Sequence, residues 1–221
     1  DTRVVFGYVI KLSVIIQIVG AILLAPFFIQ DFGLKRGLFY AIFHAISAFG
    51  NAGFTILPAG SIAYANRPFV LLIIALLIIA GSLGFLVWRD LLLYHHKHKL
   101  SLHSKLALMM TGLLIIGGWL LFELTESNLA LAQTLSPINR IVNTLFMSIS
   151  YRTAGFSQFS FSQMTPATIL LTMMLMYVGG TPGSTAGGIK TTTLGVLLLK
   201  THAALRGKKD VTFAQIGRAS C

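Results

Sequence analysis

Long apolar runs alternate with short polar segments along this sequence. The runs at 69–88 and 106–122 contain no charged residue, and each falls within the roughly 17–25 residues that a helix needs to cross a lipid bilayer. A third run, 4–29, is also long enough. It includes Lys11 and Gln17, but a lysine near one end of a run can extend its ammonium group to the membrane interface. The pattern therefore predicts three spanning helices.

A fourth apolar run, 166–206, is interrupted at 178–193 by a polar segment with five glycines. The segment is close to the phosphate-binding pattern G-x-x-x-x-G-K-[ST]. However, Ile189 separates Lys190 from the last glycine, and an apolar helical run stands where a strand should precede the loop. We therefore reject nucleotide binding and predict a spanning helix that is broken near its middle.

Two further apolar runs, 38–49 and 138–149, are too short to cross a membrane. At 1.5 Å per residue each covers ~18 Å, so it enters a bilayer without reaching the other side. Such a helix either lies in the membrane interface or re-enters as a pore helix. The segments that follow the two runs favour the pore helix.

The segments FGNAGFT and YRTAGFS follow these short runs. Each contains an Ala-Gly-Phe triplet, at 52–54 and 154–156, and each leads to a proline, Pro68 or Pro166, that can open the next helix. Because the triplets are in register with the repeated hydropathy, they predict two copies of one unit.

The predicted fold class is an all-α membrane protein of repeated helix–pore-helix–helix units, with re-entrant filter loops and one broken transmembrane helix. The first unit, 1–98, comprises a helix at 4–29, a pore helix at 38–49, a filter at 50–55, a helix at 68–88 and a cytoplasmic linker. The second unit, 99–221, comprises a helix at 104–124, a pore helix at 138–149, a filter at 151–156, the broken helix at 166–206 and a cytoplasmic tail.

Composition and charge agree with a cell-membrane location. The chain is 55% hydrophobic and 10% charged, with a mean hydropathy of +0.81. The net charge of +11 does not indicate nucleic-acid binding, because most basic residues lie in short segments between apolar runs. Most are at Arg3, in 89–105 and in 200–218. On the opposite side are Lys35, Arg36, Arg67 and Arg140. The positive-inside rule then places both ends of this multi-pass chain in the cytoplasm.

The two Ala-Gly-Phe turns can supply oxygen atoms to a dehydrated cation. Non-helical backbone is tolerated at membrane depth where it lines a water-filled cavity, and glycine lets successive carbonyl groups point the same way. A ring of carbonyl oxygens can replace the water shell of a potassium ion. Asn51 and Thr153 add side-chain oxygens, and there is no ring of acidic residues for a divalent cation. We expect the carbonyl groups of Gly53 and Gly155 on the ion path.

Arg152 directly precedes the second turn, where an exposed guanidinium would repel cations. We expect it to point behind the turn and to brace it through hydrogen bonds to backbone carbonyl groups or to a carboxylate. Glu123 and Glu126 are the carboxylates close in sequence on that side. The histidines of HHKH (95–98) predict a solvated linker rather than a metal site.

The strings SAFGNAGF, SYRTAGFS and GGTPGSTAGGIKTTT resemble the second and third repeats of the Trk/Ktr/HKT superfamily of potassium transporters, specifically the KtrB-type membrane subunit. The resemblance covers nearly the whole chain. It implies four repeats around one pore, of which this chain shows two, and a gate formed by the broken helix below the filter. It also implies a homodimer, a cytosolic nucleotide-binding ring of the KtrA or TrkA type on the basic inner face, potassium or sodium as the transported ion, sodium coupling, and no cofactor in this chain.

The candidate site has two parts. The filter residues, which would hold K+ at their carbonyl oxygens, are Gly50, Asn51, Ala52, Gly53, Arg152, Thr153, Ala154 and Gly155. The gate residues are Gly179, Gly180, Thr181, Pro182, Gly183, Ser184, Thr185, Ala186, Gly187, Gly188 and Lys190. The alternative to a gate is a rigid kink. The five glycines and the hydroxyl groups favour a movable segment, and the proline cannot extend a helix.

Three functions compete on the sequence alone. The favoured one is potassium uptake as the pore-forming subunit of a cation transporter. A non-conducting membrane scaffold, or a truncated fragment of such a transporter, is the alternative. A membrane enzyme is not expected, because the chain has no H-E-x-x-H or G-x-S-x-G motif and Lys190 has no acidic partner in its segment.

Overall fold

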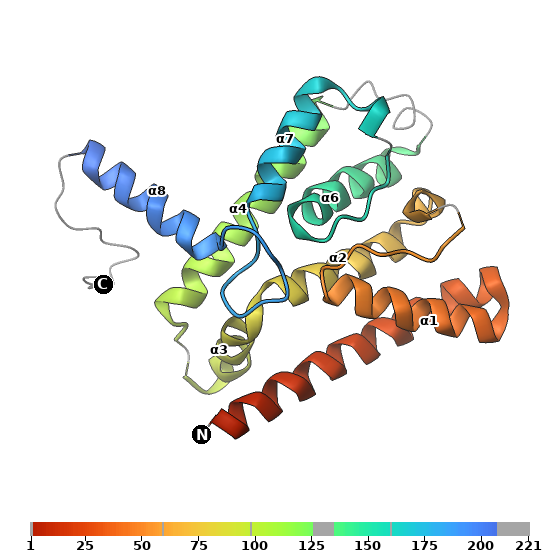
Figure 1. The fold of residues 1–221 in the computed structure, drawn as a ribbon, viewed down its shortest axis with the longest axis horizontal. Coiled ribbons are helices and arrows are strands. Elements are labelled where there is room, and N and C mark those ends of the chain that lie inside the picture. The colour runs from red at the N-terminus through yellow and green to blue at the C-terminus, as the bar shows by residue number, and fades with distance from the viewer. Residues whose placement is uncertain (1, 59, 98, 126–134, 160, 207–221) are drawn as a thin grey trace.

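The computed structural model describes residues 2–58, 60–97, 99–125, 135–159 and 161–206. The regular elements in these ranges are helices, as the sequence predicts (Figure 1). The α-helices are α1 (Thr2–Phe49), α2 (Pro68–Ser82), α3 (Gly84–Lys97), α4 (Leu102–Thr125), α6 (Pro137–Thr153), α7 (Pro166–Tyr177) and α8 (Thr191–Leu205). Short 3₁₀ helices, η1 (Gly60–Tyr64) and η2 (Phe161–Gln163), precede α2 and α7.

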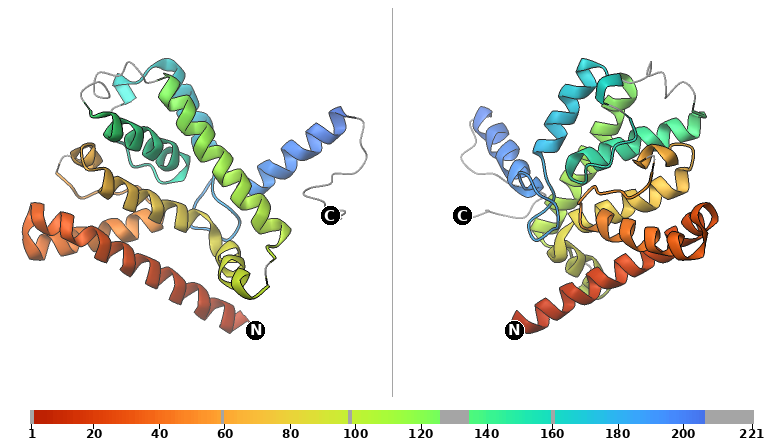
Figure 2. Two further views of the ribbon diagram at one scale, coloured as in Figure 1. Left: turned by 180° about the vertical axis from the view of Figure 1, so that it is seen from behind. Right: turned by 45° about the vertical axis from the view of Figure 1, so that its right-hand side comes forward.

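α1 is a helical hairpin rather than one straight helix. At Gly33 the backbone leaves helical geometry, with φ 78° and ψ 169°, a conformation that favours glycine. The chain reverses there, so the first arm runs along the molecule and the second arm returns beside α2 (Figures 1 and 2). The two arms correspond to the predicted helix at 4–29 and the predicted pore helix at 38–49.

The predicted helix at 68–88 is divided in two. α2 ends at Ser82, α3 begins at Gly84, and the chain bends by 100° between them. Gly84 has φ 72°, and a Cβ atom on it would lie 2.7 Å from the Pro182 carbonyl oxygen. The break is therefore made by a glycine against which a distant part of the chain packs. The sequence contains only a weak sign of this interruption, the two glycines of 80–84, which occupy in this helix the place that the polar segment occupies in the last apolar run.

The predicted interruption of the last apolar run is present. α7 ends at Tyr177 and α8 begins at Thr191, and residues 178–190 form the α7–α8 loop between them. The loop lies beside α2 and α3, whereas α8 points away from the rest of the molecule (Figure 1).

α2 lies between α1 and α6, so the two predicted units share a core. The buried side chains of this core come from all three helices, for example Phe28, Val70 and Phe146. Phe156, from the turn after α6, joins the same cluster. α4 packs against α6, α7 and α8 on the other side of the molecule. The boundary between the units at residues 98 and 99 stays a prediction.

Two of the described helices are long and apolar enough to cross a membrane, one in α1 and one in α4. The bent pair α2 and α3 is a third candidate if it counts as one span, and α7 is apolar but shorter. Large apolar side chains such as Leu76 and Leu113 remain exposed on these helices. Such surfaces fit a chain that faces lipid or further protein rather than water.

Candidate functional site

The first predicted filter segment, 50–55, forms a tight turn directly after α1. Asn51 and Gly53 take left-handed backbone conformations, with φ 51° and 72°, and the chain reverses direction. The Ser47 hydroxyl donates a hydrogen bond to the Phe54 carbonyl group at 2.8 Å. This bond holds the outgoing chain against the short helix that it has just left.

The second predicted filter segment, at the end of α6, is held in the same way. Gly155 has φ 84°, and the Ser150 hydroxyl donates to the Phe156 carbonyl group at 2.6 Å. The repeat thus extends to a serine that braces each turn. The sequence comparison missed this pair, because Ser47 and Ser150 are displaced by one position when the Ala-Gly-Phe triplets are aligned.

The two turns contact each other through their backbones. A Cβ atom on Gly53 would lie 2.0 Å from the Ala154 carbonyl oxygen, so this contact requires glycine. The Thr153 hydroxyl also donates to Asn51 Oδ1 at 2.7 Å. Gly155 differs, because a Cβ atom on it would have no atom within 4 Å. One glycine joins the turns, and the other faces open space.

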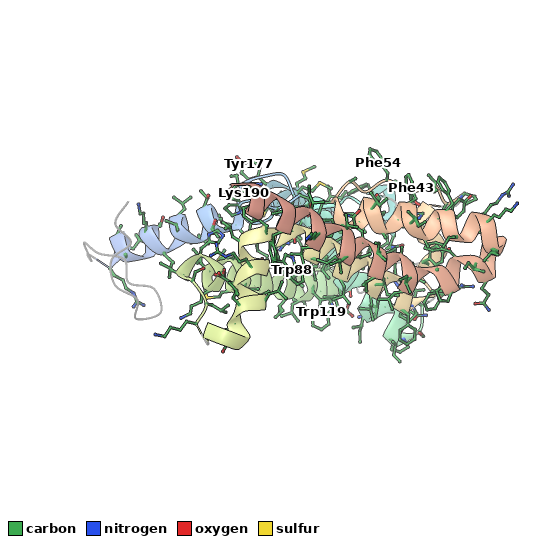
Figure 3. The ribbon with its side chains drawn as sticks, turned by 90° about the horizontal axis from the view of Figure 1, so that it is seen from below. Phe43, Phe54, Trp88, Trp119, Tyr177 and Lys190 are labelled. Carbon is green, nitrogen blue, oxygen red and sulfur yellow. The ribbon has the colours of Figure 1, made fainter. Side chains whose placement is uncertain are left out.

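The turn after α1 and the α7–α8 loop present side chains on one face of the molecule. Phe54, Tyr177 and Lys190 lie along the same edge in Figure 3, and Trp119 lies on the opposite edge. Phe54 is 70% exposed and Tyr177 is 69% exposed. Within the described chain this face therefore leaves large aromatic side chains uncovered, on the same edge as Lys190.

Arg152 is buried behind the second turn, with 1% of its surface exposed. Its Nη2 atom donates to the Ser82 hydroxyl at 2.8 Å, and Nε and Nη1 have no partner among the described residues. Of the two candidate carboxylates, Glu123 accepts hydrogen bonds from the Arg140 guanidinium instead. Glu126 lies outside the described residues. A bracing role for Arg152 stays a prediction. The partner of its guanidinium is Ser82, at the end of α2.

The predicted gate residues, 179–188 and Lys190, lie in the α7–α8 loop, and backbone contacts close its neck. Gly179 N–H donates to the Ile189 carbonyl group at 2.8 Å, and a Cβ atom on Gly179 would lie 1.5 Å from the Gly187 carbonyl oxygen. The Lys190 ammonium donates to the Ala186 carbonyl group at 2.8 Å. The loop is therefore a closed unit with internal bonds.

This loop is hydrogen-bonded to the end of α2. Thr181, which is fully buried, donates from its backbone N–H to the Ser82 carbonyl group at 2.9 Å and from its hydroxyl to the Leu83 carbonyl group. The Thr185 N–H donates to the Gly81 carbonyl group at 3.2 Å. Carbonyl groups that the break leaves without helical partners are thus satisfied by the loop. No sequence pattern indicated this docking, because the two segments lie far apart in the chain.

The loop also contacts the first turn. The Asn51 side-chain amide donates to Thr185 Oγ1 at 2.9 Å, and Thr185 Oγ1 donates to the Phe49 carbonyl group at 2.8 Å. The predicted filter and gate residues, which the sequence treats as separate groups, are therefore in direct contact.

A cavity of about 160 Å³ lies behind the loop. It is bounded by the first arm of α1, the break after α2 and the loop itself, and its lining includes Ser13, Ile16, Gly81, Gly183 and Thr185. Among the described residues, no group of three or more His, Cys, Asp or Glu side chains could hold a metal ion. Any cation held near the turns would be bound by carbonyl, hydroxyl or amide oxygens.

The profile of the TrkH family, described as cation transport protein, matches residues 1–219. The chain belongs to this family. It is 49% identical over 201 residues to the potassium/sodium uptake protein NtpJ of Enterococcus hirae, an alignment that covers 91% of this chain and 45% of that protein. It is 38% identical over 201 residues to the Ktr system potassium uptake protein B of Bacillus subtilis, covering 90% of this chain and 45% of that protein.

The crystal structure of the potassium transporter TrkH from Vibrio parahaemolyticus has the same fold, with a TM-score of 0.69 at 22% sequence identity. The match covers 97% of this chain and 44% of that one. The chain thus spans less than half the length of the relatives it matches. Membership of the cation transport protein family and the apolar helices make it a membrane protein, and the predicted resemblance to KtrB-type subunits is confirmed.

Proposed function

We propose that this chain forms part of the ion pathway of a potassium uptake protein. The observation that carries the proposal is the pair of glycine turns, one after the second arm of α1 and one at the end of α6, meeting at their backbones beside a polar loop. Non-helical backbone of this kind is stable at membrane depth only where protein or a water-filled cavity surrounds it. Two such turns side by side are suited to a permeation path.

The ion is coordinated by backbone carbonyl oxygens of the two turns, with the open side of Gly155 facing it. Oxygen dipoles can replace the hydration shell of a monovalent cation without a full negative charge. Potassium is the proposed ion and sodium the alternative. The name of the Enterococcus hirae relative mentions both ions, and that of the Bacillus subtilis relative mentions potassium alone.

The α7–α8 loop is the proposed gate. It lies against the first turn and shares the face of Phe54, so a loop in this position obstructs ions that leave the turns. Its hydroxyl groups allow it to stand in water after its bonds to α2 break.

The assembly around this chain is also part of the proposal. The uncovered face with Phe54 and Tyr177 would meet further repeats of the same kind, so that four turns surround the ion. A homodimer, sodium coupling and a nucleotide-binding ring of the KtrA or TrkA type follow from the resemblance, and cytoplasmic chain ends follow from the distribution of basic residues. The basic segments around 89–105 and 200–206 offer such a ring a surface of positive charge.

The test is ion uptake by the full-length protein in bacterial cells that lack their own potassium uptake systems, and in proteoliposomes. Gly155→Ala adds a methyl group in open space, at a φ of 84° that costs alanine about 1–2 kcal/mol, so the protein should still fold while potassium uptake, or its preference over sodium, declines. Gly53→Ala should be worse, because it also collides with the Ala154 carbonyl group. Gly117→Ala, in α4 with no atom within 4 Å, is the matched control.

Normal uptake with unchanged sodium discrimination in both turn variants would reject a carbonyl filter. A full-length wild-type protein that conducts no cation would instead support the scaffold.

A further inference from the structure

We propose that Asn51 couples the two filter turns to the α7–α8 loop, so that the geometry of the filter and the closure of the loop are linked. This inference rests on the proposed function. Asn51 is thus a positioning residue for the loop as well as a member of the filter.

A continuous chain of hydrogen bonds carries the inference. The Thr153 hydroxyl donates to Asn51 Oδ1 at 2.7 Å, and Asn51 Nδ2 donates to Thr185 Oγ1 at 2.9 Å. Thr185 Oγ1 then donates to the Phe49 carbonyl group at 2.8 Å. Each group in the chain has one consistent donor or acceptor role, and the chain runs from the second turn through the first turn to the loop.

The backbone around Asn51 is adapted to this bridge. Among the described residues Asn51 is the non-glycine residue with positive φ, and asparagine tolerates that conformation better than most side chains do. Gly81 of α2 leaves room for the amide, because a Cβ atom there would lie 2.9 Å from Asn51 Nδ2 and 1.9 Å from the Phe49 carbonyl oxygen. A simple reversal of the chain would not require either feature.

The two turns are not equivalent in this arrangement. Thr153 occupies in the second unit the position that Asn51 occupies in the first, yet it contacts Asn51 and not the loop. Along this chain of bonds the second turn reaches the loop through the Asn51 amide, and a separate route leads from Arg152 through Ser82 to Thr181. When the loop moves away, the Asn51 amide loses its hydrogen bond to Thr185. When the turns shift, the Asn51 amide moves relative to the loop.

The test uses three variants of the full-length protein in proteoliposomes. Thr185→Val keeps the side-chain shape but removes both hydrogen bonds, and Thr185→Ser keeps the hydroxyl. Asn51→Gly retains the left-handed backbone and removes the amide. We expect Thr185→Val and Asn51→Gly each to raise the maximum rate of potassium flux by roughly 2- to 10-fold, the contribution of an ordinary hydrogen bond, and Thr185→Ser to resemble wild type.

Combination with Asn51→Gly separates coupling from two independent contacts. Thr185→Val should add less to Asn51→Gly than it adds to wild type, because the bond between the two side chains is already lost and only the bond to the Phe49 carbonyl group remains to be removed. Ser184→Ala is the matched comparison in the loop, since the Ser184 hydroxyl bonds only the Thr181 carbonyl group. Its effect should be additive with that of Asn51→Gly. Additive effects of Thr185→Val and Asn51→Gly would overturn the inference.

A readout that needs no transport distinguishes failure of the coupling from failure of the proposed function. Amide hydrogen exchange in residues 179–190 should be faster in Thr153→Val, although Thr153 does not touch the loop. The acceleration should be about twofold or more and should disappear in the Asn51→Gly background. Unchanged loop exchange in Thr153→Val would overturn the coupling whether or not the protein conducts potassium.

Discussion

The last helix of each predicted unit is interrupted, between α2 and α3 in the first unit and between α7 and α8 in the second. The two interruptions differ in kind. α2 and α3 are separated by Leu83 alone and bend by 100°, whereas α7 and α8 are separated by the loop at 178–190. The short interruption leaves carbonyl groups of α2 without helical partners, and the long one supplies Thr181 and Thr185 to bind them. Each break is therefore stable in this form because the other is present.

This comparison changes the interpretation of the loop glycines. The sequence suggested that they leave the segment without a fixed conformation. In the structure they permit close contacts: Gly179 lies against the Gly187 carbonyl group, and Gly183 lies against the Phe85 ring. A closed loop with internal bonds opens by breaking its contacts with α2 and the first turn, rather than by fluctuating throughout.

The largest effect is expected from deletion of residues 181–186, which removes the whole docking surface of the loop. The lost bonds to Phe49, Gly81, Ser82 and Leu83 would together favour the closed state by about 2–6 kcal/mol. The maximum rate of ion flux should rise by at least about tenfold, and the apparent affinity, which the filter sets, should stay nearly unchanged. A folded deletion variant with the same or a lower maximum rate would make the loop a structural element and not a gate.

Arg152 tests whether the end of α2 is also tied to the filter. The guanidinium bonds Ser82, whose carbonyl group accepts from Thr181, so α2 lies between the second turn and the loop. Arg152→Lys should impair uptake almost as severely as Arg152→Ala, because lysine cannot reproduce the planar set of donors.

Ser82→Ala removes the acceptor of the Arg152 bond, together with the bond that the hydroxyl donates to the Ile79 carbonyl group, and should lower stability by about 1.5–3 kcal/mol, measured by thermal unfolding in detergent. Full transport in Arg152→Lys would show that the positive charge alone matters.

Gly84→Ala perturbs the short break and tests whether the loop opens in response. The left-handed backbone at φ 72° costs alanine about 1–2 kcal/mol, and its methyl group would collide with the Pro182 carbonyl oxygen. Gly33→Ala is the control, because Gly33 has φ 78° but no neighbour within 4 Å. Both variants should lose thermal stability, and only Gly84→Ala should raise basal flux, by roughly 5-fold or more. Equal flux in the two variants would show that the bend at Gly84 does not affect opening of the loop.

Local patterns in the sequence predicted those features that depend on neighbouring residues. Run length predicted the spanning and short helices, and the glycine-rich segment predicted the break between α7 and α8. The break at Gly84 had only a weak signal in the sequence, because the two glycines of 80–84 are compatible with a continuous helix and only the contact with Pro182 shows the purpose of Gly84. The pairings of Arg152 with Ser82 and of Asn51 with Thr185 join positions far apart in the chain, and no local pattern encodes them.

The smallest expected effect concerns the space into which the loop can move. The cavity of about 160 Å³ lies between Gly183–Thr185 and the first arm of α1, where Ser13 forms part of its wall. Ser13→Leu would fill part of this space, and an overpacking penalty of about 1 kcal/mol on the displaced loop would lower the maximum flux by about fivefold at most. The closed loop keeps all its bonds in this variant, so loop amide exchange should slow and the apparent ion affinity should not change.

Ser13→Ala, which enlarges the cavity, is the matched control and should not reduce flux. A loss of flux in both variants would point to the Ser13 hydroxyl rather than to the volume, and an unchanged rate in Ser13→Leu would mean that the loop opens away from α1, toward the face of Phe54 and Tyr177.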